Sequence, residues 1–588
     1  MDALRLEIED AITLVMDSLE IPESLWKKVL GPSREVSQGD LTMPCFPFAK
    51  ILKKAPAVVA EEICSALKEN VTIAEINSVN GYLNFKASPE WMASRVLNGD
   101  IHIGSALENN ARGKRVLIEH TSANPNGPFH VGRARNAILG DTIVRLNRLF
   151  GNSVRAEYYV DDMGKQVGVL AWALENLDSQ QVEDLLSDRE PLNPKWADKA
   201  DHSIVRWYQA AQALRQNASD SDKEQIEERI GELVHASEHG DDSVLEQFEN
   251  AYQPVLDGML MTLGRLGINF DSFTKESRFV VNGDVPRLIE KLSKSDIHGE
   301  AENGAYFLDL GQRGMKGKKE FFYRRGDGSS LYATRDVAYH IWKWGECDTL
   351  INVLGEDHRL QAKQVAMTLT ELGEKVPEVL FYAFIKLPEG KMSTRRGTVV
   401  FMDDLLEEAQ ERAAEVVRNL RPNYEPELVE SIAEAVGVSA VRFNIIKVSP
   451  EKGFTFRWED ALAFEAGSAP FVMYSHTRAC SIKSKVEEFE GFLEEAELPK
   501  EMSESMVYLL RKINSFQDSL DYAVRNRQAH IFANYLLELA NAYNGFYRDC
   551  HVIRDGKVDA FRFKISETAR KLLKASMEGL GIIPIERM

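Results

Sequence analysis

The sequence predicts an α/β fold class: a Rossmann-type parallel sheet with a helical insertion, an N-terminal α+β module and a C-terminal all-α helical bundle. First, an apolar run at 115–120 precedes a loop, a helical pattern and a strand pattern at 154–160, which is typical of a nucleotide-binding sheet. Second, the mostly polar, helical residues 170–265 separate these strands from another apolar strand at 348–355. Third, the chain from about residue 404 onward shows helical periodicity almost throughout.

These patterns divide the chain into three expected domains. Residues 1–110 combine an amphipathic helix at the acidic N-terminus, a helix that begins at Pro56, and two strands joined by a turn at Asn80–Gly81. Residues 111–403 hold the parallel sheet, with its helical insertion at about 170–265, and residues 404–588 form the helical bundle. The acidic start also differs from a secretory signal, which begins with basic residues and then turns apolar.

Composition excludes several classes of protein. The longest apolar runs fall well short of the roughly 20 residues that span a bilayer, so we expect no membrane partner and a cytoplasmic location. The net charge of −20 argues against a general nucleic-acid coat protein, although one basic face could still contact RNA. Five scattered cysteines without a CxxC pair predict neither a disulfide framework nor a zinc site: Cys45, Cys64, Cys347, Cys480 and Cys550.

The segment at 119–136, EHTSANPNGPFHVGRARN, carries the clearest chemical signal. A strand ends there, a loop rich in Asn, Pro and Gly follows, and a helix begins near Gly132. Backbone N–H groups at a helix N-terminus bind phosphate, and His130 at the mouth of this helix can donate to phosphate oxygens. Gly132 leaves space for a flat base against the backbone. A loop histidine without a ligand is the alternative interpretation of His130.

The same segment resembles a known signature. HVGR at 130–133 resembles the "HIGH" motif of class I aminoacyl-tRNA synthetases, and KMSTR at 391–395 resembles their "KMSKS" motif. The two motifs lie about 260 residues apart, in the right order, on opposite sides of the helical insertion. Nearly the whole chain resembles arginyl-tRNA synthetases of the archaeal type, in YYVDDMGKQVG, LGINFDSFTKESRF, LYATRDVAYH, VLGEDHRLQAKQ, SAPFVMYSHTRA and GLGIIPIERM.

The resemblance implies an arginine site, and the chemistry of its residues fits. A guanidinium is planar, cationic and rich in donors, so carboxylates and a hydroxyl suit it. The guanidinium-binding positions of the family match Glu119, Tyr332 and Asp336, of which the last two share a face if 331–336 is helical. An Asp336–Arg335 salt bridge is the alternative interpretation. The positions that hold the α-carboxylate and amine of arginine match Asn124 and Gln364.

The resemblance also implies an ATP site with Mg²⁺ bound to the nucleotide, and no dedicated metal cage is evident. His130 and Lys391 are the expected catalytic residues, with Lys391 steadying the phosphates as charge builds in the transition state. The remaining ATP-binding positions would be Asn124, Pro125, Gly132, Arg133, Gly355, Asp357, His358, Met392 and Ser393.

Two positions depart from the family pattern. Thr394 replaces the second lysine of the KMSKS motif, and Arg395 or Arg396 is a hypothetical source of the missing charge. Arg133 replaces the second histidine of the HIGH motif, which suits phosphate binding.

The implied reaction is the activation of arginine by ATP and its transfer to the 3′-terminal adenosine of its tRNA, by a protein expected to be a monomer. The resemblance assigns the tRNA elbow to the N-terminal module and the anticodon to the C-terminal bundle, where Tyr474, Tyr543, Tyr547 and Phe546 could stack on bases. Core packing is the alternative for each aromatic, and we expect it for Phe546. Another class I synthetase and a tRNA-binding paralogue without catalysis remain as alternative functions.

Overall fold

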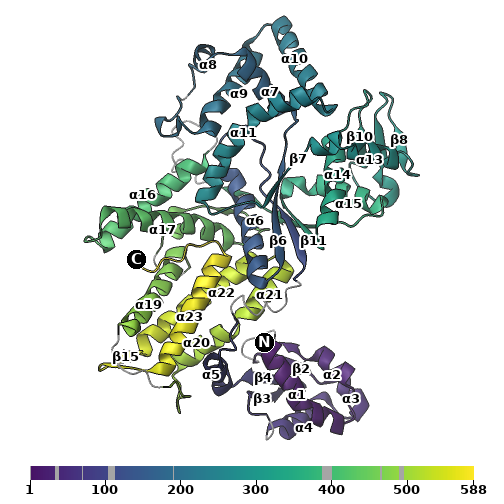
Figure 1. The fold of residues 1–588 in the computed structure, drawn as a ribbon. Helices are drawn as coiled ribbons and strands as arrows, with labels where there is room; N and C mark the ends of the chain where they lie inside the picture. The colour runs from purple at the N-terminus through teal and green to yellow at the C-terminus, as the bar shows by residue number, and fades with distance from the viewer. Residues whose placement is uncertain are drawn as a thin grey trace.

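The structure is a computed structural model that describes residues 2–33, 39–68, 71–102, 113–189, 191–386, 400–463, 467–488 and 495–588. Figure 1 shows four parts around a central sheet: an N-terminal module, a helical insertion, a small antiparallel sheet, and a C-terminal helical bundle. The fold class predicted from the sequence is confirmed, and the small antiparallel sheet is an addition to it.

The central sheet has five parallel strands in the order β12–β11–β5–β6–β7. Counted along the chain, this is the order 3-2-1-4-5 of a doubly wound Rossmann-type sheet, read from the β7 edge. Ligands of such sheets bind where the strand order reverses, which here is the carboxyl end of neighbouring strands β5 and β11. The strands are β5 (Arg115–Glu119), β6 (Ser153–Val160), β7 (Ser272–Lys275), β11 (Thr349–Gly355) and β12 (Glu378–Tyr382).

Helix α6 (Val131–Phe150) connects β5 to β6 and packs between the sheet and the C-terminal bundle. It begins after His130 and ends at Gly151, whose φ of 99° is the left-handed conformation that ends many helices. Helices α14 (Tyr332–Glu346) and α15 (Arg359–Glu371) precede and follow β11. The sequence pattern RARNAILGDTIVRLNRLFG at 133–151 predicts a helix closed by Gly151, and α6 confirms it.

The predicted helical insertion lies between β6 and β7. It stands as a separate helical layer above the sheet in Figure 1, and Pro254 lies inside its longest helix. Its helices are α7 (Lys165–Asn176), α8 (Ser179–Leu185), α9 (Ala200–Asn217), α10 (Asp220–Glu238) and α11 (Asp242–Arg265), with the short 3₁₀ helix η3 (Pro194–Trp196).

A second insertion, which the sequence patterns do not predict, lies between β7 and α14. Its antiparallel strands pair in the order β10–β9–β8 and enclose a separate core with Phe279, Leu308 and Tyr323. The basic segment GQRGMKGKKEFFYRR at 311–325 has the composition of a loop, but Glu320–Arg324 within it form strand β10. The elements are α12 (Arg278–Val281), α13 (Asp284–Leu292), β8 (His298–Glu300), β9 (Tyr306–Asp309), the 3₁₀ helix η4 (Leu310–Arg313) and β10 (Glu320–Arg324).

The N-terminal module packs four helices on an antiparallel sheet of order β1–β2–β4–β3, and α5 links it to the rest of the chain. The turn at Asn80–Gly81 is confirmed, with φ of 51° and 83°, and so is the helix that begins at Pro56. Its elements are α1 (Asp2–Ser18), α2 (Glu23–Val29), β1 (Gly31–Pro32), β2 (Leu41–Pro44), α3 (Phe46–Leu52), α4 (Pro56–Lys68), β3 (Ala74–Val79), β4 (Tyr82–Ala87) and α5 (Pro89–Asn98).

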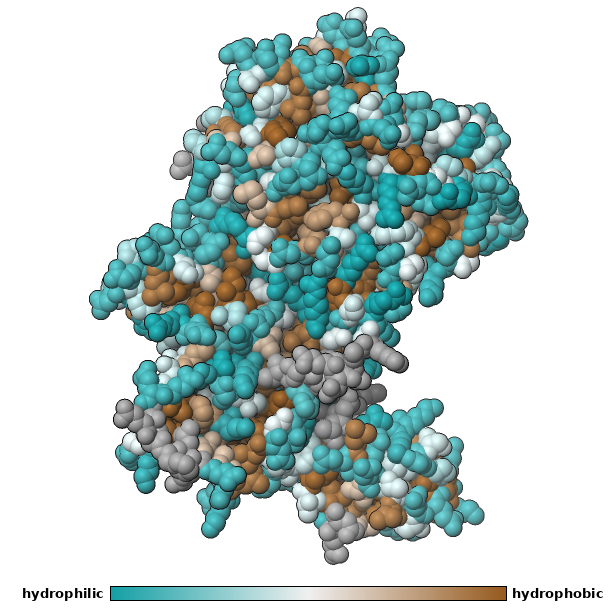
Figure 2. All heavy atoms as spheres, in the orientation of Figure 1, coloured by the Kyte–Doolittle hydropathy of each residue, from teal (hydrophilic) through white to brown (hydrophobic). Residues whose placement is uncertain are grey.

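The C-terminal part is a bundle of long helices whose apolar faces form one continuous core with the sheet. Phe546 is fully buried in it, as expected. Figure 2 shows the mostly hydrophilic outer surface of one face, and among the described helices none combines the length and hydropathy needed to cross a bilayer. The main helices are α16 (Met402–Leu420), α17 (Pro426–Ile446), α19 (Ala469–Glu487), α20 (Glu504–Asn514), α21 (Phe516–Asn526), α22 (Ala529–Asp549) and α23 (Ala560–Gly579).

Candidate active site

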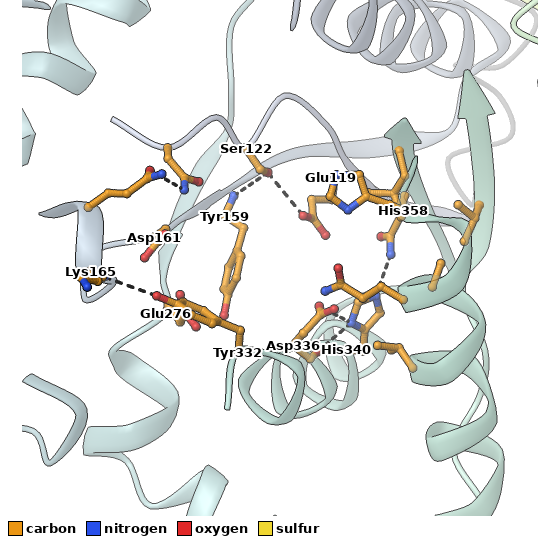
Figure 3. Close-up of a pocket in the computed structure, with 18 of the residues that line it drawn as sticks. Glu119, Ser122, Tyr159, Asp161, Lys165, Glu276, Tyr332, Asp336, His340 and His358 are labelled. Atoms are coloured by element: carbon orange, nitrogen blue, oxygen red, sulfur yellow. Dashed lines mark hydrogen bonds and ion pairs between the residues drawn. The ribbon is translucent and has the colours of Figure 1, made fainter. Parts of the chain in front are cut away.

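A cavity of about 770 Å³ opens at the carboxyl end of the sheet, where β5 and β11 lie side by side. Figure 3 shows polar side chains pointing into it from β5, β6, α7 and α14. Of the residues predicted to bind arginine or ATP, five line this cavity: Glu119, Asn124, Tyr332, Asp336 and His358. This is the position that the strand order favours for a ligand.

Glu119, the last residue of β5, is held on both sides of its carboxylate. Its Oε2 lies 2.5 Å from Nζ of Lys343, which is fully buried on α14. Its Oε1 accepts a hydrogen bond of 3.3 Å from the hydroxyl of Ser122. Ser122 and the preceding Thr121 both adopt positive φ, 37° and 68°, so the chain turns sharply after the strand and returns Ser122 to the cavity.

Tyr332 and Asp336 occupy the first turns of α14, so the predicted shared face is confirmed. His340, one turn further along, lies with Nδ1 3.0 Å from Oδ1 of Asp336. Burial acts to raise the pKa of Asp336, but His340, Lys343 and Gln361 lower it below its usual range, so the carboxylate is ionised. Arg335 does not pair with Asp336, so the alternative salt bridge between these neighbours is wrong.

Two further carboxylates, Asp161 and Glu276, line the cavity, and neither was predicted from the sequence. Burial raises the pKa of Glu276 above its usual range; Arg335 opposes this shift, whereas Asp161 adds to it. Arg335 contacts the Glu276 carboxylate and stacks over the ring of Tyr332, with Cζ 4.5 Å from the ring centroid. The sequence could have indicated Asp161 and Glu276, because each directly follows a strand pattern, in YYVDD and FTKES respectively. Ligands of parallel sheets bind at these strand ends.

His130 lies at the start of α6, outside the residues that line this cavity. Burial, with a smaller effect of Arg133, lowers the pKa of His130 to about 4, so the imidazole is neutral at neutral pH. Its backbone pairs with Phe401 in an antiparallel bridge, which ties the start of α6 to the chain just before α16. A Cβ on Gly132 would lie 2.9 Å from Nδ1 of His130, so only glycine permits this ring position.

Three other residues predicted to bind ATP lie in the loop between β5 and α6 or in the first turn of α6: Asn124, Pro125 and Arg133. The amide of Asn124 donates to Oε1 of Gln166 over 3.2 Å, which fixes it at the cavity wall. Arg133 donates to the carbonyl of Asn124 over 3.4 Å, and Pro125 is buried beside it. The structure thus brings Arg133 and Asn124 together, while Arg133 and Pro125 lie behind the cavity lining.

The segment after β11 contains the remaining described ATP positions. Gly355 ends β11, and a Cβ there would lie 2.4 Å from Oδ1 of Asp357, so glycine allows this carboxylate to lie against the backbone. Asp357 and His358 are exposed on the 3₁₀ helix η5 (Glu356–His358), and only His358 lines the cavity.

Gln364, predicted to bind arginine, lies outside the residues that line the cavity. Its amide donates to the carbonyls of Lys318 and Glu320, both at 3.4 Å. Gln361, one helical turn earlier on α15, lines the cavity and bonds to Asp336. The small antiparallel sheet, which the sequence patterns did not predict, supplies the carbonyls that draw Gln364 away.

The predicted KMSTR segment lies outside the described residues. This applies to Lys391, Met392 and Ser393, and equally to Thr394, Arg395 and Arg396.

Comparison with known proteins decides the family. The sequence profile described as "tRNA synthetases class I (R), catalytic domain" matches residues 95–458. The chain belongs to the class I arginyl-tRNA synthetase family. Two further profiles of this family's parts match: "Arginyl tRNA synthetase N terminal domain" at 2–87 and "DALR anticodon binding domain" at 472–588.

Relatives and solved structures agree with this family. The arginine–tRNA ligase of Methanocella arvoryzae is 41% identical over 545 residues, covering 92% of each chain. That of Methanothermobacter thermautotrophicus is 37% identical and covers 99% of each chain. The structure of Thermus thermophilus arginyl-tRNA synthetase matches with a TM-score of 0.78 at 26% identity, covering 99% of this chain and all of that one. The family assignment expected from the sequence motifs is confirmed.

One cluster of metal-ligating side chains occurs within the described ranges: Asp201, His202 and Asp403. The ammonium of Lys199 already occupies its centre, 2.8 Å from Oδ2 of Asp201 and 2.8 Å from Oδ2 of Asp403. Nε2 of His202 lies 2.9 Å from the same Asp403 oxygen. The donor set therefore suits an internal ion-pair cluster that joins the helical insertion to α16, and we assign it no metal.

Proposed function

We infer that the chain is an arginine–tRNA ligase, which activates arginine with ATP and transfers it to the 3′-terminal adenosine of its tRNA. The observation that carries this inference is the cavity beside the α6 N-terminus, where four carboxylates surround a space that suits a cation. Family membership over the whole chain supports the same reaction.

For arginine we propose that Asp336 and Tyr332 bind the guanidinium, with Glu119 and Asn124 completing the site. Asp336 is the ionised carboxylate without a lysine or arginine ion-pair partner among the described residues, so it suits a forked donor. Gln361 takes the place expected for Gln364, and Glu276 and Asp161 add negative charge on the opposite wall.

For ATP we propose that the start of α6 binds the phosphates through its free N–H groups, with Gly132 leaving the backbone open. His130 is neutral and contributes a hydrogen bond rather than a charge. Arg133, Asn124 and Pro125 shape the loop, Gly355, Asp357 and His358 lie toward the nucleoside, and Lys391, Met392 and Ser393 act on the phosphates from the second motif. The magnesium complex of ATP is the substrate.

The proposed chemistry is an in-line displacement. A carboxylate oxygen of arginine attacks the α-phosphorus, the bond to the β-phosphate oxygen breaks, and pyrophosphate leaves with that electron pair. A hydroxyl of the terminal tRNA adenosine then attacks the carbonyl carbon of the adenylate, and AMP leaves. Charge placement carries such steps, so no covalent nucleophile is required.

We propose the division into domains 1–110, 111–403 and 404–588, with a monomer that acts in the cytoplasm. The N-terminal module would contact the tRNA elbow and the bundle the anticodon. Among the aromatic candidates, Tyr543 and Phe546 are fully buried and belong to the core. Tyr474 and Tyr547 remain as candidates to stack on bases, and Arg478 lies 4.4 Å from one ring centroid and 5.1 Å from the other.

Aminoacylation with purified tRNA and each amino acid in turn tests this function. We expect arginine alone to be charged, and ATP–pyrophosphate exchange with arginine to be weak until tRNA is added. Exchange with lysine or glutamate in place of arginine would indicate another class I synthetase. Binding of tRNA without any charging would indicate a non-catalytic paralogue.

A further inference from the structure

A continuous chain of hydrogen bonds joins Glu119 to Asp336 along the cavity wall, and Lys343 is the member of this chain that does not line the cavity. From Glu119 it passes to Lys343 on α14 over 2.5 Å, and from Lys343 to Oδ1 of Asn352 on β11 over 3.2 Å. From Nδ2 of Asn352 it reaches Nε2 of His340 over 2.6 Å, and Nδ1 of His340 lies 3.0 Å from Oδ1 of Asp336. Figure 3 shows Asp336 and His340 adjacent, with Glu119 facing them across the cavity.

Lys343 sets the direction of every bond in this chain. An ammonium only donates, so Asn352 must present its carbonyl oxygen to Lys343 and its amide nitrogen to His340. Nε2 of His340 must then accept, which leaves its proton on Nδ1, where it is shared between the backbone carbonyl of Asp336 at 2.7 Å and the carboxylate oxygen Oδ1 at 3.0 Å. One buried cation thereby determines both the neighbour of Glu119 and the tautomer of the histidine that holds Asp336.

Lys343 also sets the charge of the cavity. Four carboxylates line it, together with Lys165 and Arg215, which both pair with Glu227. Two of the four carboxylates have a buried cation as partner: Lys343 for Glu119, and Arg335 for Glu276. Within the part of the chain that the structure describes, Asp161 and Asp336 form no ion pair with lysine or arginine. Two carboxylates without such a partner match the two cationic groups of free arginine, its α-ammonium and its guanidinium.

We propose that Lys343, Asn352 and His340 are positioning residues that orient Glu119 and Asp336 and set the charge of the cavity for a dicationic amino acid. This inference rests on the proposed arginine site. None of the three residues needs to touch the reacting atoms. Lys343 does not line the cavity, so its effect reaches the substrate through Glu119 and Asp336, and it should therefore appear in the KM for arginine rather than in the KM for ATP.

A double-mutant cycle in aminoacylation of tRNA by the full chain tests the proposal. Lys343→Met should raise the KM for arginine about tenfold or more, with the KM for ATP and kcat changed far less. In the Glu119→Gln background the same substitution should raise this KM by a smaller factor, because the contact with the Glu119 carboxylate is gone and only the branch through Asn352 and His340 to Asp336 remains. Lys343→Arg should restore part of the arginine affinity.

Asn352→Asp provides a second variant of nearly the same size that reverses the hydrogen-bond polarity. The new carboxylate at position 352 accepts from Lys343, but its second oxygen also requires a donor from His340. The proton of His340 therefore moves to Nε2, and the contact between Nδ1 and Asp336 changes. We expect the KM for arginine to rise here too, and this variant carries the test if Lys343→Met fails to fold. Lys447→Met is the matched control, since Lys447 is half-buried, donates to the carbonyl of Gly467 and lies outside the cavity.

The outcomes separate the two proposals. If Asp336→Asn raises the KM for arginine while Lys343→Met and Asn352→Asp both leave it unchanged, the positioning role is wrong and the arginine site stands. Equal effects of Lys343→Met in the wild-type and Glu119→Gln backgrounds also overturn it. If Asp336→Asn and Glu119→Gln have no effect either, the arginine site itself is misassigned.

Discussion

Arg335 and Glu276 form an ion pair in which both side chains are enclosed by protein, and Glu238 lies 3.5 Å from the same guanidinium. Arg335 also stacks over Tyr332, so one residue joins the wall of the cavity to the helical insertion. Arg335 and Asp336 are adjacent in sequence but point to different environments. Arg335 is a cation enclosed by protein, whereas Asp336 lines the cavity.

Replacing Arg335 with leucine should destabilise the protein strongly. Removal of one partner of a buried pair leaves an uncompensated carboxylate and costs roughly 3–5 kcal/mol. A clear fall in the thermal unfolding temperature, measured by differential scanning calorimetry, is the expected result. Arg287→Leu is the control, because Arg287 pairs with Asp284 over 2.6 Å on the surface, and its loss should change the unfolding temperature little.

Replacing Asp336 with asparagine should weaken arginine binding by about 1.5–3 kcal/mol, because a charged hydrogen bond to the guanidinium becomes a neutral one. The KM for arginine in aminoacylation measures this. Gln361→Ala should also raise that KM, whereas Gln364→Ala should not, since only Gln361 lines the cavity. A larger effect at Gln364 than at Gln361 would contradict the assignment of Gln361, and not Gln364, to the arginine site.

Arginine binding should strengthen as the pH rises toward 8. Burial raises the pKa of Glu276 above the usual range of a carboxyl, so this group begins to take up a proton as the pH falls below neutral. A bound cation favours the carboxylate, so binding at the lower pH values releases a proton, and the KM for arginine should fall from pH 6.5 to 8. Asp336 contributes no slope in this range because its pKa is lowered.

Glu276→Gln provides the control for this pH dependence. The variant should bind arginine more weakly at pH 8 and show a nearly flat dependence of the KM for arginine on pH. A slope that survives in Glu276→Gln would assign the titration to another group.

His130 should act as a neutral group. Its pKa is lowered to about 4, so its protonation does not change between pH 5.5 and 8. His130→Ala should slow adenylate formation by roughly 10²–10³-fold, the usual effect of removing one donor from a charge-stabilising site. Single-turnover formation of the adenylate, with tRNA present, measures this. A loss of rate in the wild-type enzyme near pH 6.5 that disappears in His130→Asn would contradict a neutral His130.

Local patterns were enough to predict much of the fold. The turn at Asn80–Gly81, the end of α6 at Gly151 and the helical face shared by Tyr332 and Asp336 each depend on a few neighbouring residues. The burial of Phe546 follows in the same way from helical spacing.

The rest depended on contacts between distant segments. The bond between Lys343 and Glu119 joins residues 224 positions apart, and no periodicity reveals it. Gln364 faces away because the small antiparallel sheet supplies carbonyls for its amide, and that sheet was not predicted. Glu276 directly follows β7, as Asp161 directly follows β6. Only the pairing of β6 with β7 brings these two carboxylates to the same cavity.

Gly164 should tolerate no side chain, because the backbone there approaches the cavity closely. A Cβ at this position would lie 2.6 Å from Oδ1 of Asp161 and 2.9 Å from the hydroxyl of Tyr332. Its N–H also donates to the same Asp161 oxygen over 3.0 Å, so Gly164→Ala must displace both cavity residues. We expect the KM for arginine to rise about tenfold or more, with a smaller change in the KM for ATP.

Gly231→Ala is the matched control for this substitution. Gly231 lies within α10, and a Cβ there meets no atom within 4 Å, so the change should leave charging unaltered. It should also stabilise the helix by about 0.5–1 kcal/mol, because alanine loses less backbone entropy than glycine on folding. If Gly164→Ala charges arginine as well as Gly231→Ala does, then Asp161 and Tyr332 do not hold the substrate in the positions described.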